Sequence, residues 1–242
     1  MSLTKKTVLI TGSTRGIGLA LATHYTEAGW NVIGTARATS NTDKLLALSP
    51  FKIVTMDTSD EASVAEAADK LQGVTIDLLI NNAGTGWLTD IVPASKKLLM
   101  NTFEVNAVGP FLVTRALQPN LQLAARDHGF ASVVQLSSLL GSVASNTENN
   151  AFIFRDQVAY SSSKAALNMV TRSLAVDLRE KDIAVVAIHP GYVGTELTAG
   201  QGPLNPADVA GAISDIVAKL TLKDTGKFLN ADPTMPGSEL PW

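Results

Sequence analysis

Near its start the chain places a buried strand, a glycine-rich turn and a helix in direct succession, and this order limits the fold more than any other feature. Val8, Leu9 and Ile10 form the predicted strand, TGSTRGIG follows over residues 11–18, and an apolar helix runs to about Ala28. At such a junction, free backbone N–H groups and the positive end of the helix dipole face the turn. The segment therefore predicts a phosphate site, with an ordinary glycine turn as the alternative.

The three glycines of this turn have separate predicted tasks. Gly12 permits a tight turn, Gly16 lets a phosphate approach the backbone, and Gly18 lets the helix pack on the strand. Their spacing differs from G-x-G-x-x-G, so the general dinucleotide fingerprint is met only in part.

The second predicted strand, residues 30–36, ends where the sequence indicates a preference between cofactors. A ribose with a free 2′-hydroxyl needs an acidic residue about 20 positions after the glycine turn. Ala36 and Arg37 stand there instead, and no carboxylate precedes Asp43. Arg15 can reach the same place from the turn, and two guanidiniums favour a 2′-phosphate and hence NADP(H). Two solvated arginines are the alternative interpretation.

Strands alternate with helices along the rest of the chain. This alternation predicts an α/β fold in which a parallel sheet carries helices on both faces. No repeat or low-complexity linker divides the 242 residues, so we expect one domain over 1–242. The further strands are predicted at residues 52–56, 77–80, 132–136, 183–188 and about 227–229.

Polar residues follow three of these strands. Asp57 and Thr58 come after the third strand, residues 81–84 (Asn-Asn-Ala-Gly) end the fourth, and Ser138 follows the fifth. Ligands of open parallel sheets bind beyond the carboxyl ends of the strands, so we expect the first two groups to face a cofactor. The Ser138 hydroxyl can donate to a substrate oxygen there without being a nucleophile.

Tyr160 and Lys164 lie about one helical turn apart near the start of a long predicted helix. This spacing places the phenol and the ammonium on one helix face. A neighbouring cation favours the phenolate, so we expect Lys164 to lower the pKa of Tyr160 and make it an acid–base group. A surface helix carrying one Tyr and one Lys is the alternative.

Asn106 lies in an apolar helical stretch that Gly109 and Pro110 are expected to bend. A bend frees carbonyl groups and leaves room for an ordered water. A core asparagine bonded to a neighbouring strand is the other interpretation, and both roles can coexist.

The composition argues against several classes of protein. The net charge is −3 with no basic block, which argues against a nucleic-acid partner, and no polybasic or long apolar segment indicates a membrane. The six residues before the first strand leave no room for a secretory signal, and the absence of cysteine fits a reducing compartment. We therefore expect a cytoplasmic protein. His24, His128 and His189 are interpreted as structural or solvated, and no metal-ligand spacing occurs.

Taken together, these motifs closely resemble the short-chain dehydrogenase/reductase family over nearly the whole chain. The resemblance depends on the glycine turn, Asn81-Asn82-Ala83-Gly84, Asn106, Ser138, Tyr160-x-x-x-Lys164 and Pro190-Gly191, all in order. The short loop after Thr195 and the ending Leu240-Pro241-Trp242 resemble the C-factor-like carbonyl reductase branch.

The resemblance implies a single-domain Rossmann-type, doubly wound parallel sheet of about seven strands. It also implies that Tyr160 is the general acid/base, that Lys164 lowers the pKa of Tyr160 and binds the nicotinamide ribose, that Ser138 polarises the carbonyl, and that Asn106 keeps a water in the proton relay. The cofactor NADP(H) would contact Gly12, Ser13, Thr14, Arg15, Gly16, Ile17, Gly18, Arg37, Asp57, Thr58, Asn82, Ala83, Gly84, Tyr160, Lys164, Pro190, Gly191, Val193 and Thr195.

Two segments depart from the common family pattern. An insertion at about 142–156 lengthens the path from Ser138 to Tyr160, and the segment at about 195–205 is shorter than the usual substrate loop. We therefore expect the insertion to cover the active site more than the C-terminal side does. Its apolar residues Phe152, Ile153 and Phe154 either pack on the protein's own helices or line the substrate mouth.

Three functions follow from this interpretation. The first is an NADPH-dependent reductase of ketones or aldehydes, the second an NADP(H)-binding regulatory protein with little turnover, and the third an alcohol dehydrogenase. The partner is a small-molecule carbonyl or alcohol substrate, which the sequence does not name. A homodimer or homotetramer is expected through the helices near residues 100–127 and 157–180, with a monomer as the alternative.

Overall fold

The computed structural model describes residues 5–86, 91 and 93–242 of the chain. Residues 1–4, part of the segment considered for a secretory signal, lie outside the described residues. Seven strands form one parallel sheet in the order β3-β2-β1-β4-β5-β6-β7, which confirms the predicted single-domain Rossmann-type fold. The strands are β1 (Thr7–Ile10), β2 (Asn31–Ala36), β3 (Lys52–Thr55), β4 (Leu78–Asn81), β5 (Ala131–Leu136), β6 (Ile183–His189) and β7 (Phe228–Asn230).

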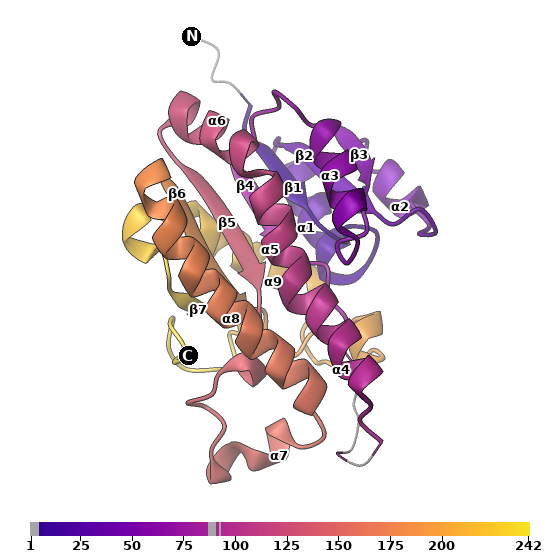
Figure 1. The fold of residues 1–242 in the computed structure, drawn as a ribbon, viewed down its shortest axis with the longest axis vertical. Coiled ribbons are helices and arrows are strands. Elements are labelled where there is room, and N and C mark those ends of the chain that lie inside the picture. The colour runs from indigo at the N-terminus through magenta and orange to yellow at the C-terminus, as the bar shows by residue number, and fades with distance from the viewer. Residues whose placement is uncertain (1–4, 87–90, 92) are drawn as a thin grey trace.

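Helices cover both faces of the sheet (Figure 1). One layer contains α1 (Gly16–Glu27), α2 (Asp43–Leu46) and α9 (Pro206–Ala218). The opposite layer contains α3 (Glu61–Asp69), α5 (Gly109–Ala116), α6 (Gln118–His128) and α8 (Val158–Leu178), and α4 (Lys96–Phe103) packs against α8.

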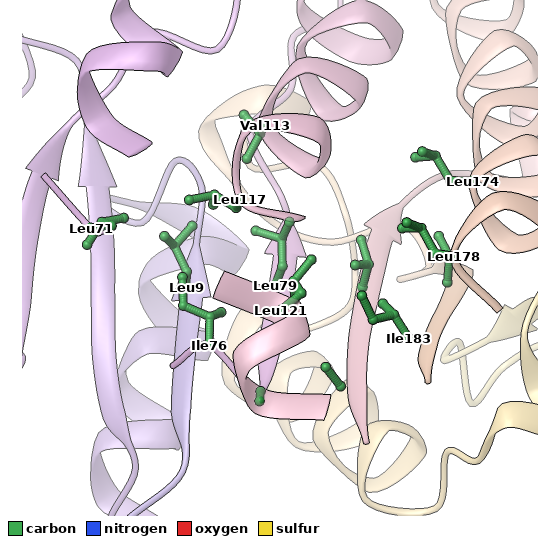
Figure 2. Close-up of a cluster of buried hydrophobic side chains, with 14 of the residues drawn as sticks. Leu9, Leu71, Ile76, Leu79, Val113, Leu117, Leu121, Leu174, Leu178 and Ile183 are labelled. Carbon is green, nitrogen blue, oxygen red and sulfur yellow. The ribbon is translucent and has the colours of Figure 1, made fainter. Parts of the chain in front are cut away.

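The core is divided by the sheet because successive strand residues point to opposite faces. Leu9 belongs to the cluster under α3, α5, α6 and α8, and Figure 2 shows it beside Leu79 and Leu121. Val8 and Ile10 belong to the cluster under α1 and α9. Each fully buried aliphatic side chain contributes about 1.5–3 kcal/mol, so a shift of one residue in β1 would be very costly.

The helix expected over about 100–127 is divided into segments, and proline explains both breaks. A π-helical turn, η1 (Glu104–Val108), joins α4 to α5, and the Gly109 N–H bonds back to the Glu104 carbonyl. Pro110 has no N–H, so an unbroken α-helix through this point would lose a hydrogen bond. The second break precedes Pro119, which stands in the first turn of α6.

The insertion at 142–156 was expected to be a loop but contains two short helical segments, η3 (Glu148–Asn150) and α7 (Ala151–Phe154). The end of the chain contacts the start of the insertion: Ser142 Oγ donates to the Pro241 carbonyl at 2.7 Å and Ala144 N donates to the Trp242 carbonyl at 2.9 Å. The remaining short segments are η2 (Leu139–Gly141), η4 (Arg179–Lys181), η5 (Glu196–Thr198) and η6 (Leu222–Asp224). Within the described residues, no helix has both the length and the apolar content that a bilayer crossing requires.

Candidate active site

The turn between β1 and α1 depends on glycine at three points. Gly12 and Gly16 have φ of 65° and 53°, in the left-handed region that favours glycine. A methyl group on Gly18 would lie 2.3 Å from the Gly12 carbonyl oxygen, which no real structure permits. The helix therefore starts directly beneath the turn, and its first N–H groups are directed toward whatever the turn holds.

Asn82 fastens this turn to the end of β4. Its Nδ2 donates to the carbonyls of Thr11 and Gly12 at 2.8 and 3.0 Å, while Thr11 Oγ1 accepts from the N–H groups of Asn82 and Ala83. The buried Ser13 hydroxyl likewise donates to a backbone carbonyl, that of Thr35. The side chains of Ser13 and Asn82 therefore shape the turn, and they do not project freely from it.

Arg15 and Arg37 are exposed beside the same turn. Arg15 is the residue before α1, and Arg37 directly follows β2, whose Thr35 accepts from the N–H groups of Gly12 and Ser13. In the part of the chain that the structure describes, neither guanidinium takes part in a hydrogen bond or an ion pair. Both charges are therefore available to an anion.

Asp57 and Thr58 follow β3, as predicted. Asp57 Oδ1 accepts from the N–H and the hydroxyl of Ser59 at 3.0 and 2.7 Å. Thr58 is buried, and a methyl group on Gly109 would lie 2.7 Å from its carbonyl oxygen. This contact joins the end of β3 to the start of α5.

Ser138, Tyr160 and Lys164 come together at the carboxyl edge of the sheet. The Ser138 hydroxyl lies close enough to the Tyr160 hydroxyl to lower the pKa of Tyr160. Lys164 is buried and its Nζ lies 5.7 Å from the centre of the Tyr160 ring, where it donates to the Leu136 carbonyl at 2.7 Å. A methyl group on Gly84 would lie 3.9 Å from Lys164 Nζ, so the end of β4 reaches the same place.

The pKa of Tyr160 differs in direction from the prediction. Burial raises the pKa of Tyr160 to about 12, and the hydrogen bond from Ser138 offsets only part of this rise. Burial also lowers the pKa of Lys164 to about 8. In the protein alone, removal of Tyr160 from water therefore outweighs any effect of the Lys164 cation on the tyrosine pKa, so the net shift is opposite to the expected one.

Asn106 is fully buried in the π-helical turn η1, and its side chain bonds to a loop and a helix where a bond to a neighbouring strand was predicted. Its Oδ1 accepts from Thr85 N at 2.8 Å, and its Nδ2 donates to the Thr85 carbonyl and to Ser163 Oγ at 2.7 and 3.0 Å. The side chain thus links η1 to the segment after β4 and to α8. The carbonyl of Asn106 is four residues before Pro110, which has no N–H to donate to it.

The turn after β6 faces the glycine turn across an open cavity of about 680 Å³. Gly191 has a φ of 87° after Pro190, Val193 is buried, and Thr195 Cγ2 would lie 3.3 Å from a methyl group on Gly16. Gly16, Gly194 and Thr195 are among the residues that line this cavity. Of the predicted cofactor residues, Gly16 and Thr195 therefore lie at this cavity, whereas Ser138, Tyr160 and Lys164 are not among the residues that line it.

Both segments that depart from the family pattern have a definite place in the structure. The short segment after Thr195 reaches the active site, because Leu197 Cδ1 and the Tyr160 ring lie 3.5 and 3.1 Å from a methyl group placed on Gly86. Phe152 in the insertion is 77% exposed, so packing on the protein's own helices is wrong for this residue. Phe154 is half-buried.

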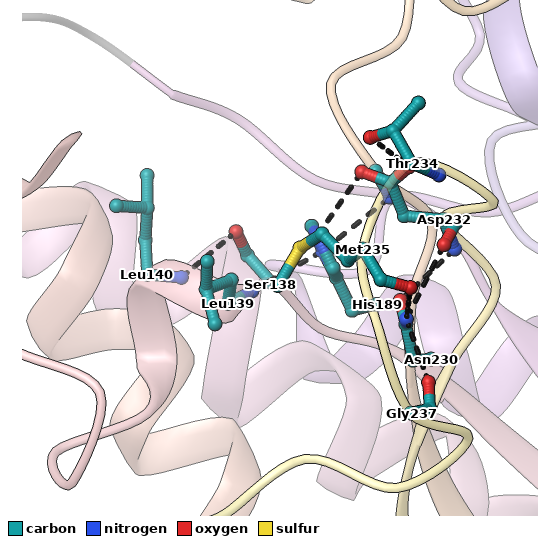
Figure 3. A network of polar contacts seen from close by, with 10 residues as sticks. Ser138, Leu139, Leu140, His189, Asn230, Asp232, Thr234, Met235 and Gly237 are labelled. Carbon is teal, nitrogen blue, oxygen red and sulfur yellow. Dashed lines mark hydrogen bonds and ion pairs between the residues drawn. The ribbon is translucent and has the colours of Figure 1, made fainter. Parts of the chain in front are cut away.

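The sequence did not indicate that His189 and Asp232 lie together near the active site. His189 was interpreted as structural or solvated, and it is buried, with Asp232 Oδ2 at 4.0 Å from its Nε2 (Figure 3). Asp232 drew no prediction because no motif links it to the active site. Within the described ranges, no group of three or more His, Asp or Glu side chains is arranged to hold a metal.

Comparison with known proteins agrees with this geometry. A model of the short chain dehydrogenase family matches residues 6–204. The C-signal protein of Myxococcus xanthus is 35% identical over 171 residues, which cover 69% of this chain and 93% of that protein. Among solved structures, an NADPH-bound carbonyl reductase from chicken fatty liver has a TM-score of 0.87 at 30% identity, covering 99% of this chain and 100% of that one. The carbonyl reductase Sniffer of Drosophila melanogaster has a TM-score of 0.86 at 28% identity, covering 98% and 100%. The chain belongs to the short-chain dehydrogenase/reductase family of oxidoreductases, near its carbonyl reductase branch.

Proposed function

We propose that the protein reduces a ketone or aldehyde to an alcohol with NADPH as the hydride donor. The observation that carries this proposal is that Lys164 lies buried beside the Tyr160 ring and donates to the Leu136 carbonyl, two residues before the buried Ser138. These residues lie at the edge of the sheet where the glycine turn opens, and the NADPH-bound carbonyl reductase from chicken fatty liver has the same fold.

The residues present fit a dinucleotide with a 2′-phosphate. The glycine turn and the start of α1 offer N–H groups to a pyrophosphate, and the close approach at Gly16 needs a residue without a side chain. The exposed guanidiniums of Arg15 and Arg37 have no partner among the described residues, and a 2′-phosphate offers each of them one. Asp57, Ala83 and Gly84 lie at the neighbouring strand ends, where the rest of the cofactor is expected.

When bound, the nicotinamide supplies a hydride to the carbonyl carbon. Ser138 and Tyr160 donate hydrogen bonds to the carbonyl oxygen, and these bonds strengthen as negative charge grows on that oxygen. Tyr160 then transfers its proton to the oxygen, which completes the alcohol and leaves a phenolate. The charge of Lys164 stabilises this phenolate, because opposite charges attract strongly in a buried site.

In the protein alone, the pKa values place the proton on Tyr160 at neutral pH. With a pKa of about 12, Tyr160 holds its proton at neutral pH and is a proton donor, the form that reduction needs. With a pKa of about 8, Lys164 stays mostly charged at pH 7 yet can release a proton to Tyr160. Pro110 cannot donate the α-helical hydrogen bond to the Asn106 carbonyl, and we propose that this carbonyl holds a water on the path by which Lys164 regains its proton.

The test is oxidation of NADPH and of NADH against a panel of ketones, aldehydes and quinones. We expect a higher kcat/KM with NADPH, and Arg37→Asp should reverse the preference because a carboxylate repels the 2′-phosphate and accepts from a 2′-hydroxyl. Arg179→Asp, at an exposed arginine beyond α8, is the matched control and should leave the preference unchanged. Equal or better turnover with NADH in the wild type would refute the NADPH preference. Tight NADPH binding without turnover of any carbonyl would favour the regulatory alternative.

We also propose that the protein is a homodimer or homotetramer that associates through α4, α5 and α8. These helices expose large apolar side chains: Met100 is 57%, Phe111 38%, Met169 67% and Val176 74% exposed. Association would remove this apolar surface from water. Light scattering at several concentrations tests it, and a constant mass near 25.4 kDa would show a monomer.

A further inference from the structure

His189 stands where three strand ends meet at the carboxyl edge of the sheet. It is the last residue of β6, and its carbonyl accepts from Ala231 N at 2.9 Å, just after β7. On the other side, Ser137 N donates to the Ile188 carbonyl at 2.9 Å, just after β5. The imidazole is therefore held between the turn that carries Ser138 and the segment that follows β7 (Figure 3).

The imidazole accepts hydrogen bonds from both turns of the active site. Its Nδ1 lies 3.2 Å from Leu139 N and 3.4 Å from Gly191 N, and both are N–H donors. A nitrogen can accept only without a proton, so the ring proton belongs on Nε2. Burial lowers the pKa of His189 to about 4, which keeps the ring neutral at physiological pH and leaves this choice of nitrogen decisive.

Asp232 is placed to fix that choice. Its Oδ2 lies 4.0 Å from His189 Nε2, and its other oxygen accepts from the N–H and the hydroxyl of Thr234 at 2.8 and 2.7 Å. Asn230 holds the backbone of the same turn, because its Oδ1 accepts from Asp232 N at 2.9 Å. A carboxylate opposite Nε2 favours a proton on that nitrogen.

We propose that His189 and Asp232 form a positioning pair that orients the Ser138 hydroxyl toward the reacting carbonyl and holds the Pro190–Gly191 turn beside it. The link to Ser138 is short: its next residue, Leu139, donates to His189, and the following N–H, of Leu140, donates to Ser138 Oγ at 3.2 Å. These two bonds fix the turn at consecutive residues. The inference rests on the proposed role of Ser138 in carbonyl reduction.

The test is the nearly isosteric variant Asp232→Asn. The oxygen that accepts from Thr234 keeps its place, so the amide NH₂ takes the position of Oδ2 and faces Nε2. This arrangement favours a proton on Nδ1, which then opposes the N–H groups of Leu139 and Gly191. We expect kcat to fall on the order of 10- to 100-fold through misplacement of Ser138, with a smaller change in the Kd of NADPH.

The matched rescue is His189→Asn, whose Oδ1 can stand where Nδ1 does and accepts in every protonation state. This variant should keep kcat within about threefold of the wild type, and adding Asp232→Asn to it should cost little more. Two results would overturn the proposal. One is an unchanged kcat in Asp232→Asn, and the other is that Asp232→Asn lowers kcat as much in the His189→Asn variant as in the wild type. Asp77→Asn, in the His128–Asp77 pair at the opposite edge of the sheet, controls for loss of stability alone.

A second measurement needs no substrate. Nitrogen NMR of the histidine rings should show His189 protonated on Nε2 in the wild type and on Nδ1 in Asp232→Asn. An Nδ1-protonated wild type would overturn the positioning pair. A wild type with the Nε2 proton but no reductase activity would instead overturn the proposed function, so the two failures are distinguishable.

Discussion

The two edges of the sheet each contain a histidine–aspartate pair, and the pairs differ in what the imidazole bonds. At the amino edge, His128 Nδ1 lies 2.5 Å from Asp77 Oδ1, and the other oxygen of Asp77 accepts from Thr7 N at 2.7 Å. At the carboxyl edge, His189 and Asp232 are 4.0 Å apart, and the imidazole accepts from the backbone of two turns. The amino-edge aspartate joins a helix end to the first strand, whereas the carboxyl-edge histidine orders loops.

We therefore expect the amino edge of the sheet to contribute to stability and the carboxyl edge to contribute to catalysis. The amino edge is closed by direct bonds between elements, such as Ile76 N to the Asn120 carbonyl at 3.2 Å. The carboxyl edge instead contains left-handed glycines, the buried Lys164 and the buried hydroxyl of Ser138. Substitutions at the first edge should change the free energy of unfolding, and substitutions at the second should change turnover.

The largest expected effect at the carboxyl edge is that of Tyr160→Phe. Removal of the proton donor should lower kcat by about 10²- to 10⁴-fold, while the ring still fills its place and NADPH still binds. Steady-state kinetics and a fluorescence titration with NADPH measure the two quantities. If more than a tenth of the activity remained, Tyr160 would not be the donor.

The buried charge of Lys164 predicts a stability that depends on pH. Its pKa of about 8 in the folded protein lies below the value of about 10.4 in an unfolded chain, so the unfolded state binds more protons between these values. The free energy of unfolding should therefore rise as pH increases from about 8 to 10, by about 3 kcal/mol at most. Above about pH 10 the rise ends. The pKa of Tyr160 is raised in the folded protein, so its phenol deprotonates first in the unfolded chain, and the free energy of unfolding then falls as pH increases.

Denaturant unfolding at pH 7, 8, 9 and 10 measures this slope, and Lys164→Met supplies the comparison. The variant has no ammonium to titrate, so its stability should not rise over this range. A similar rise in both proteins would assign the effect to other groups.

At the amino edge, Asp77→Asn should lower the free energy of unfolding by about 1–3 kcal/mol. The change weakens the contact with His128 and the bond from Thr7 N at a buried position. We expect kcat/KM to stay within twofold, since the pair lies at the far edge from Ser138. Loss of turnover at unchanged stability would contradict the separation of the two edges.

The smallest expected change in stability is that of Phe152→Ala in the insertion, which belongs to neither edge. Because Phe152 is 77% exposed, the free energy of unfolding should change by less than about 0.5 kcal/mol. If this side chain lines the substrate mouth, KM should rise more for bulky carbonyls than for small ones, with the Kd of NADPH nearly unchanged. An equal rise for all substrates would argue against that role.

Sequence order alone was sufficient for much of the fold. Alternating strands and helices determined the parallel sheet, and the glycine turn, Asn82 and Ser138 were placed correctly at strand ends because the chain enters that edge directly after each strand. Tyr160 and Lys164 were placed on one face because helical spacing is local.

The remaining features depend on contacts between distant segments. The raised pKa of Tyr160 reflects how densely other elements surround it, which spacing within one helix does not reveal. Asp232 approaches His189 only because β7 pairs with β6 and the chain then turns back at Asn230. The short helix α7 was missed because it has only four residues, too few to show a helical period.

The π-helical turn at Glu104–Val108 also sets the rotational phase of the helices on either side of it. One residue of an α-helix corresponds to a rotation of about 100°, so the extra residue of this turn offsets the faces of α4 and α5 by that angle. Deleting a single residue here would restore a uniform helix and turn α4 about its axis relative to α5. The Asn106 side chain, which is hydrogen-bonded to the backbone of Thr85, would then leave its position. The length of this segment is therefore constrained as strictly as the identity of Asn106.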